Sequence, residues 1–234
     1  MIRSYYKDFR WLDWCLRSIE RFCIGFGHAI LVVPEASRER LDWLGLSGDR
    51  TITCPNYADD YLGQQVTKLY ADRFSDADYI CHVDSDCVFV QPVRPDTLFE
   101  QDLPRLTMVP YRTLDRHVPW RGLTERFIGA PVEYEFMRSP PYMFPRWLYP
   151  ALRQHVQALH GVTAEHYVLS QPPRGFSEIN ALAAYAYVHE RDAFTWIDLS
   201  RASAPEALCR AYWSWGGIDA GTEAELEALL GAVA

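Results

Sequence analysis

Two apolar runs flank a pair of acids between residues 78 and 90, and this stretch constrains the fold more than any other. Residues 79–83 are rich in β-branched and aromatic types and too few for a buried helix, so they predict an interior strand of a covered sheet. Asp84 and Asp86 follow at the carboxyl end of that strand. In extended chain, residues i and i+2 point to the same side, so we expect both carboxylates in one crevice, with Ser85 pointing away.

The acidic pair needs a compensating charge, because neighbouring carboxylates repel each other and lose hydration beside an apolar strand. Hard cations such as Mg²⁺ take oxygen ligands and keep waters and substrate phosphates in their shell. The pair therefore predicts a site for a divalent cation and a diphosphate. A solvated turn or a helix-capping aspartate is the alternative, since 31 acids in 234 residues produce the same tripeptide by chance.

The chain before the acidic pair alternates between predicted strands and helices, which is typical of an α/β fold with parallel strands, helices on both faces and ligands at the carboxyl ends of the strands. Strands are expected at residues 1–5, 29–33 and 51–54, and helices from a cap at Asp8 to Gly25, from a cap at Ser37 to Leu44, and over 62–74.

The pattern changes after residue 100. We expect strands at 106–110, 132–137 and 194–199, irregular structure at 139–145, a helix from Pro145 to Gly161, a helix capped by Ser177 that begins with Glu178, and a final helix opened by a capping box of Thr222 and Glu225.

Asp84-Ser85-Asp86, with a strand before it and a short strand after it, resembles the DxD motif of GT-A glycosyltransferases. Phe176-Ser177-Glu178 resembles the Phe-Ser-Glu of small bacterial and viral GT-A-like proteins. The resemblance covers the chain from Arg3 to about Gly217. It implies a single GT-A (Rossmann-like) domain over 1–234, with a mixed, mainly parallel sheet flanked by helices. Residues 1–100 would form the nucleotide-sugar-binding half and 101–234 the acceptor-binding half.

The resemblance also implies roles for individual side chains. Asp86 would bind Mn²⁺ or Mg²⁺ directly, and Asp84 would bind it through water or hold the ribose. Glu178 would take the acceptor proton if the reaction inverts, or hold a sugar if it retains; a carboxylate favoured by the helix dipole is the alternative. The remaining donor-binding candidates are Arg3, Tyr5, Asp8, Gln64, Gln65, Lys68 and Ser85, with Lys68 on the diphosphate.

Two of these assignments have competing interpretations. Lys68 and the two glutamines also suit a solvated helix face, and Tyr5 suits the core. GT-A enzymes often take a third metal ligand, a histidine, from near the C-terminus, but no histidine follows His189. That ligand is therefore expected to be absent, replaced by water, or supplied by Asp219.

The expected function is metal-dependent transfer of a sugar from a nucleotide sugar, most simply a UDP-sugar, to a hydroxyl acceptor. The acceptor would be a glycan precursor or a hydroxymethylated base flipped out of DNA. Residues 105–174 hold nine arginines against five acids in a chain of net charge −8, which suits a phosphate-bearing partner; local pairing of the arginines is the alternative. Rival functions are a non-catalytic nucleotide- or glycan-binding relative and a sugar-nucleotide pyrophosphorylase, although residues 4–8 lack the glycine-rich loop of the latter.

Hydropathy and cysteine spacing predict the compartment. No apolar run approaches the ~20 residues of a membrane span, and the first residues lack a signal-peptide layout, so we expect a cytoplasmic protein without a span. The six cysteines lack CxxC spacing and predict buried, reduced thiols.

Overall fold

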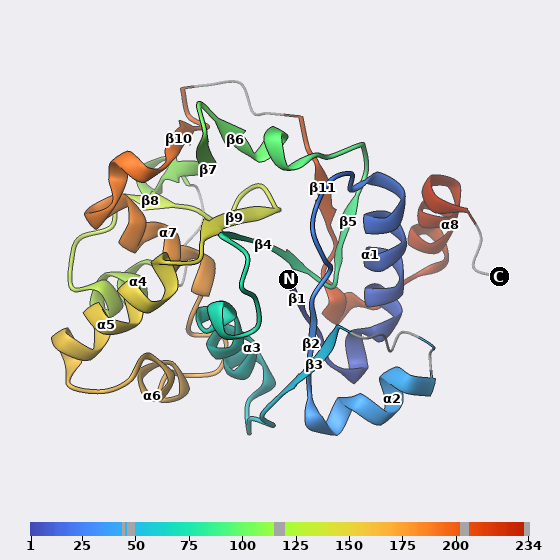
Figure 1. Ribbon diagram of the computed structural model, residues 1–234, viewed down its shortest axis with the longest axis horizontal. Coiled ribbons are helices and arrows are strands. Elements are labelled where there is room, and N and C mark those ends of the chain that lie inside the picture. The colour runs from blue at the N-terminus through green and yellow to red at the C-terminus, as the bar shows by residue number, and fades with distance from the viewer. Residues whose placement is uncertain (44, 46–49, 115–119, 202–205, 232–234) are drawn as a thin grey trace.

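Five strands form the central sheet in the order β3–β2–β1–β4–β9 (Figure 1). The computed structural model describes residues 1–43, 45, 50–114, 120–201 and 206–231. The four parallel strands are β1 (Ile2–Arg3), β2 (Leu31–Pro34), β3 (Thr51–Cys54) and β4 (Tyr79–Asp84); β9 (Tyr142–Pro145) runs antiparallel to β4. The sheet is mostly parallel and flanked by helices, which confirms the predicted α/β class.

Two smaller sheets come from the second half of the chain. In one, β10 (Thr195–Asp198) pairs in parallel with β7 (Leu103–Pro110), which also pairs antiparallel with β6 (Phe99–Glu100) and β8 (Tyr134–Glu135). In the other, β11 (Cys209–Ala211) pairs antiparallel with β5 (Cys87–Phe89). This last pairing brings a late segment back to the strand that follows the acidic pair.

Alternate residues of β4 face opposite sides of the sheet and pack against different helices. Val83 belongs to the cluster built by α1 (Phe9–Phe22) on one face. Ile80 belongs to the cluster built by α3 (Asp60–Leu69) on the other. Asp84 therefore ends β4 on the side of α3. Two further helices are α2 (Arg38–Trp43) and α8 (Ala220–Leu230), and α8 lies beside α1 (Figure 1).

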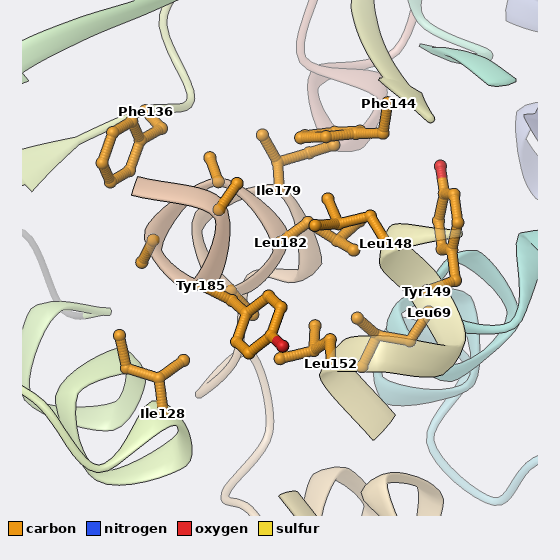
Figure 2. Close-up of a cluster of buried hydrophobic side chains, with 14 of the residues drawn as sticks. Leu69, Ile128, Phe136, Phe144, Leu148, Tyr149, Leu152, Ile179, Leu182 and Tyr185 are labelled. Atoms are coloured by element: carbon orange, nitrogen blue, oxygen red, sulfur yellow. The ribbon is translucent and has the colours of Figure 1, made fainter. Parts of the chain in front are cut away.

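Helix α7 (Glu178–His189) lies at the centre of the larger core. Figure 2 shows Ile179, Leu182 and Tyr185 surrounded by side chains of neighbouring elements, among them Leu148 and Leu152. The four alanines of α7 are fully buried, so small side chains let other helices approach it closely. A helix that is apolar all round is a buried helix. Its neighbours include α3, α4 (Arg121–Ile128) and α5 (Leu148–His160), with α6 (Ala164–Leu169) packed on α3 and α5.

Most of the predicted strands and helices are present, but three expectations in the second half are wrong. Residues 142–145 are not irregular: Tyr142, Met143 and Phe144 are buried, and they form the edge strand β9, where a terminal proline needs no hydrogen-bond partner on its open side. Helix α5 accordingly begins at Leu148 rather than Pro145. The strand expected at 132–137 shrinks to Tyr134–Glu135.

Helix ends differ from the predicted caps at two places. Helix α8 begins at Ala220 because Asp219, not Thr222, caps it: the Thr222 N–H donates to the Asp219 carboxylate at 2.7 Å. Asp8 stands at the cap position of α1 but its side chain makes no capping hydrogen bond. The end expected for α2, Leu44, lies outside the described residues.

Two predictions about covalent and membrane chemistry can be compared with the structure. All six cysteines are free thiols, as predicted; four are buried and two, Cys23 and Cys81, are half-buried. Within the described part of the chain, no helix combines the length and apolar character needed to cross a bilayer.

Candidate active site

The acidic pair lies at the carboxyl end of β4, where the candidate site begins. Asp84 is the last residue of β4, and Ser85 and Asp86 form the turn that leads into β5. The flanking strands were predicted, but the extended conformation expected for the tripeptide is wrong, because the chain reverses there. Ser85 is buried in that turn.

Lys68 joins the two acidic features that lie far apart in the sequence. Its ammonium donates to Asp84 and, at 2.7 Å, to Glu178 Oε1. The Lys68 and Glu178 side chains are only 2% and 5% exposed, whereas that of Asp84 is 37% exposed. Burial alone would lower the pKa of Lys68, but the two carboxylates outweigh it and raise that pKa. Lys68 is therefore a buried cation whose two ion pairs connect β4 to α7.

Glu178 begins α7, and hydrogen bonds fix both its backbone N–H and its carboxylate. Ser177 caps the helix as predicted, accepting from the Asn180 N–H at 3.3 Å. The Glu178 N–H donates to Gln65 Oε1 at 2.9 Å. Burial raises the pKa of Glu178, and the Lys68 charge opposes that rise. Gln64, one residue earlier, donates to Asp84 Oδ1 at 3.1 Å, so the two neighbouring glutamines support the two acids separately.

Arg3 lies at the end of β1, beside Asp84 in the parallel register. The Arg3 side chain is 1% exposed. Its guanidinium donates two hydrogen bonds, of 2.5 and 2.6 Å, to the carboxylate of Asp60, the first residue of α3. This fork fixes the start of α3 against the sheet, and Arg3 is no longer accessible to a donor. Asp60 was not among the residues expected at the site.

Tyr5 and Asp8 follow Arg3 at the same edge of the sheet. Burial raises the pKa of Asp8, the Ser214 hydroxyl opposes that rise, and the charges of Asp60 and Asp84 add to it. Burial, with the charges of Asp8 and Asp60, also raises the pKa of Tyr5. Both side chains are half-buried, so they line the site and remain reachable.

Asp86 carries the clearest electrostatic signal of the site. Burial first and the Asp84 charge second raise its pKa to about 7, although the Ser214 N–H donates to its Oδ2 at 3.0 Å. The Tyr212 N–H also donates to the Asp86 carbonyl, at 2.8 Å. The C-terminal segment thus closes directly onto the acidic turn.

The residues on either side of Ser214 form an exposed aromatic pair. Trp213 and Trp215 are 66% and 73% exposed, with ring centroids 6.4 Å apart. Large exposed aromatic surface beside a polar site is typical of a place where a ring-shaped ligand stacks. The density of tryptophan between residues 213 and 215 is the sequence signal for this surface.

Five carboxylates and two cationic side chains converge here; the carboxylates are those of Asp8, Asp60, Asp84, Asp86 and Glu178, and the cations are Arg3 and Lys68. The acids outnumber the bases, and the charges of Asp84 and Asp8 add to burial, the larger cause, in raising the pKa of Asp86. Within this set, Asp84 and Asp86 are the two carboxylates that could hold a divalent cation, which would draw further ligands from water and a diphosphate.

Asp219 is not brought to this set as a third ligand. Its exposed carboxylate caps α8, and among the described residues no group of three or more His, Cys, Asp or Glu side chains is spaced to hold a metal ion. Asp84 and Asp86 therefore remain a two-carboxylate candidate.

No protein-family model matches the chain, and a search of curated proteins finds no match. The candidate site consequently rests on its geometry and electrostatics.

Proposed function

We propose that this chain is a GT-A glycosyltransferase that moves a sugar from a nucleotide sugar, most simply a UDP-sugar, to a hydroxyl acceptor. The observation that carries the proposal is the placement of Asp84 and Asp86 together at the turn after β4, where burial and the neighbouring Asp84 charge raise the pKa of Asp86. The carboxyl end of a parallel strand is where an α/β sheet binds ligands, and a metal-bound diphosphate would relieve the charge of the half-buried acidic turn there.

Asp84 and Asp86 would hold Mn²⁺ or Mg²⁺, Asp86 directly and Asp84 through its free oxygen or a water. One Asp84 oxygen is already bound by Lys68 and Gln64, which supports the smaller share for Asp84. Bound there, the metal supplies electrostatic stabilisation of the departing diphosphate.

Glu178 and Lys68 fit supporting roles better than direct chemistry. A general base must reach the proton it takes, and Glu178 is buried and held by Lys68. This favours the holding role that a retaining enzyme would give Glu178. Lys68 in turn holds Asp84 by a hydrogen bond. Because Lys68 is buried, it would stabilise the diphosphate by long-range electrostatic attraction rather than by a direct hydrogen bond.

The donor nucleotide would lie between the half-buried side chains of Tyr5 and Asp8 and the tryptophan pair at residues 213 and 215. Tyr5 offers a ring for stacking on the base, and Asp8 an acceptor for ribose hydroxyls. Gln64 would lie beside the donor as well, because its side chain donates a hydrogen bond to Asp84.

The test is a thermal-shift panel of UDP and UDP-sugars with and without Mn²⁺. We expect a metal-dependent rise in melting temperature for the wild type that Asp86→Ala abolishes. Asp76→Ala removes an exposed aspartate from the segment that precedes β4, at the opposite end of that strand from Asp86, and should keep the rise. UDP affinity that is unchanged in Asp86→Ala would defeat the proposal.

A non-catalytic nucleotide-binding relative is the second candidate, because Glu178 is shielded and Asp219 is occupied as a cap. Slow hydrolysis of a bound UDP-sugar in the presence of Mn²⁺ would identify an active transferase. Metal-dependent binding with every donor intact after prolonged incubation would identify the binding protein.

A further inference from the structure

A cavity of about 230 Å³ lies between β7, the loop that precedes β9, and β11. Its walls include Arg105 from β7, Arg138 and Pro141 from the loop, Tyr142 from β9, and Leu208 just before β11. None of these residues belongs to the acidic set of the candidate active site. The volume is below the ~300–1,000 Å³ of pockets for drug-sized ligands and suits one sugar ring with a substituent.

Strand register places this cavity at the same end of β4 as Asp84. Tyr142 pairs with His82 in the antiparallel β4–β9 ladder, so residues 138–141 continue along the last part of β4. On the other wall, Leu208 precedes β11, whose first residue, Cys209, pairs with Phe89 at the end of β5 that lies farther from the acidic turn. Tyr142 links the cavity to the site, because it lines the cavity and belongs to β9, which pairs with the last part of β4.

Arg105 gives the cavity an uncompensated cation. Along β7, Arg105 alternates with the core residues Leu106 and Met108, so it and Thr107 face away from the main core. In the described part of the chain its buried Nε has no hydrogen-bond partner and its guanidinium makes no ion pair. A buried donor left unpaired is unfavourable, and an oxyanion in the cavity would satisfy it.

The other charged side chains that line the cavity, Arg138 and Glu206, do not neutralise Arg105 within the described residues. Arg138 contacts the buried carboxylate of Glu135, which holds it at the cavity edge. Glu206 also lines the cavity, but it is exposed and forms no ion pair with Arg105 within the described residues. The wall therefore offers a guanidinium fork for an oxyanion beside apolar surface from Pro141 and Leu208.

We infer that this cavity is the acceptor subsite and that it takes an anionic sugar-sized acceptor, one bearing a carboxylate or a phosphate monoester, with Arg105 binding the oxyanion. This inference rests on the proposed transferase function and deepens it. It makes Arg105 a specificity-determining residue, because a neutral acceptor would leave its Nε unpaired.

The test is a calorimetric titration of the full chain with four probes: methyl glucuronide and glycerol 3-phosphate, and their neutral counterparts methyl glucoside and glycerol. We expect at least one anionic probe to bind at least about tenfold more tightly than its neutral counterpart, since hydrogen bonds to charged groups are the stronger kind. The probe that binds distinguishes a carboxylate acceptor from a phosphate acceptor.

Three variants assign the effect: Arg105→Gln and Arg146→Gln remove the same charge, and Arg105→Lys keeps it. Arg105→Gln should remove the preference for the anion, and Arg105→Lys should retain part of it. Arg146→Gln, an exposed arginine at the opposite end of β9, should leave it intact. Equal affinity for charged and neutral probes, or equal losses in the Arg105 and Arg146 variants, would overturn the inference.

The same variants tested with UDP and Mn²⁺ separate the two proposals. Arg105→Gln should keep the metal-dependent UDP shift while it loses the anionic probe. An absent UDP shift in the wild type with an intact Arg105-dependent anion site would refute the transferase alone. A normal UDP shift without any anion preference would refute the acceptor subsite alone.

Discussion

The ammonium of Lys68 is out of water and binds carboxylates from β4 and α7. Removing one partner of a buried ion pair leaves an uncompensated charge, at a cost of about 3–5 kcal/mol. We expect Lys68→Met to lower the free energy of unfolding by that amount in urea titrations. Lys68→Met combined with Glu178→Gln should recover part of the loss, because the second change removes the orphaned charge.

Lys7→Met serves as the matched control, since Lys7 is exposed and lies in the turn before α1. Its effect should stay within about 0.5 kcal/mol, as for most surface substitutions. A Lys68 variant that is no less stable than the Lys7 variant would contradict a buried triad.

Asp86 predicts a pH-dependent effect on stability. Its folded pKa of about 7 lies above the ordinary value near 3.8, so between these values the folded chain keeps a proton that the unfolded chain has lost. Wild-type stability should therefore fall as pH rises from ~4 to ~7. Asp86→Asn lacks this loss, and its advantage should be smallest near pH 4 and reach on the order of 1–3 kcal/mol above pH 7.

Melting curves from pH 4 to pH 8 measure this advantage, and Asp76→Asn at an exposed position is the control. Saturating Mn²⁺ at pH 8 should narrow or reverse the difference, because the metal stabilises only the wild type. A constant difference across the pH range would show that Asp86 keeps its ordinary pKa in the folded chain.

At the residue scale, sequence patterns identified the acids that stand alone and missed the partners that define them. Asp84 and Asp86 were singled out from the end of their strand, and Glu178 from its helix start and the Phe-Ser-Glu resemblance; the structure joins Asp84 and Glu178 through Lys68. Asp60 and Ser214 were missed because their roles depend on Arg3, 57 residues away from Asp60, and on Asp86, 128 residues away from Ser214. No local spacing encodes such contacts.

The start of α7 links an element to the site. Ser177 accepts from the Asn180 N–H, so Ser177→Ala should destabilise the protein by about 1 kcal/mol. It should also lower sugar transfer, because the first turn of α7 positions Glu178. Thr163 caps α6 in the same way, accepting from the His166 N–H at 3.1 Å.

Thr163→Ala is thus a control with a similar loss of stability, and it should leave transfer unchanged. Urea unfolding and UDP-sugar turnover, measured on both variants, compare the two caps. Equal effects on turnover would mean that α7 acts only through global stability.

Elements with a clear period and a clear stop signal were predictable at that signal, such as the C-terminal end of α5 at the left-handed Gly161, although its start was not. Strand β9 was not, because two prolines precede it and a third ends it, and only its place at the edge of the sheet makes that sequence acceptable. Strand β11 is three residues long and is defined by its partner β5, which local sequence does not reveal.

Burial differs sharply between helices of the whole molecule. Helix α7 is enclosed by the main core, whereas α8 lies at the margin and has one buried residue, Leu226. Amides of enclosed elements exchange only on global opening, and marginal elements open locally. We expect α7 to be among the last helices to exchange and α8 to exchange at least about tenfold faster, measured by hydrogen–deuterium exchange with peptide resolution; equal rates would contradict this architecture.

The basic segment at 105–174 is less available to a large polyanion than its composition suggests. Arg121, Arg138 and Arg153 each pair with a carboxylate, and Arg153 does so with two hydrogen bonds to Asp72. These contacts support local pairing for part of the segment. A DNA acceptor would require duplex binding that weakens steeply with salt, and no binding at low salt would exclude it.

The ion pairs of Lys68 with Asp84 and Glu178 have a consequence for synthesis on the ribosome. Lys68 and Asp84 leave the exit tunnel while α7 is still untranslated, so the nascent chain exposes a lysine destined for burial before its second carboxylate exists. The early strands also wait for β9 to complete their sheet. Because such partly folded chains are prone to aggregate, we expect a chaperone that shields this face during that interval to raise the yield of folded protein.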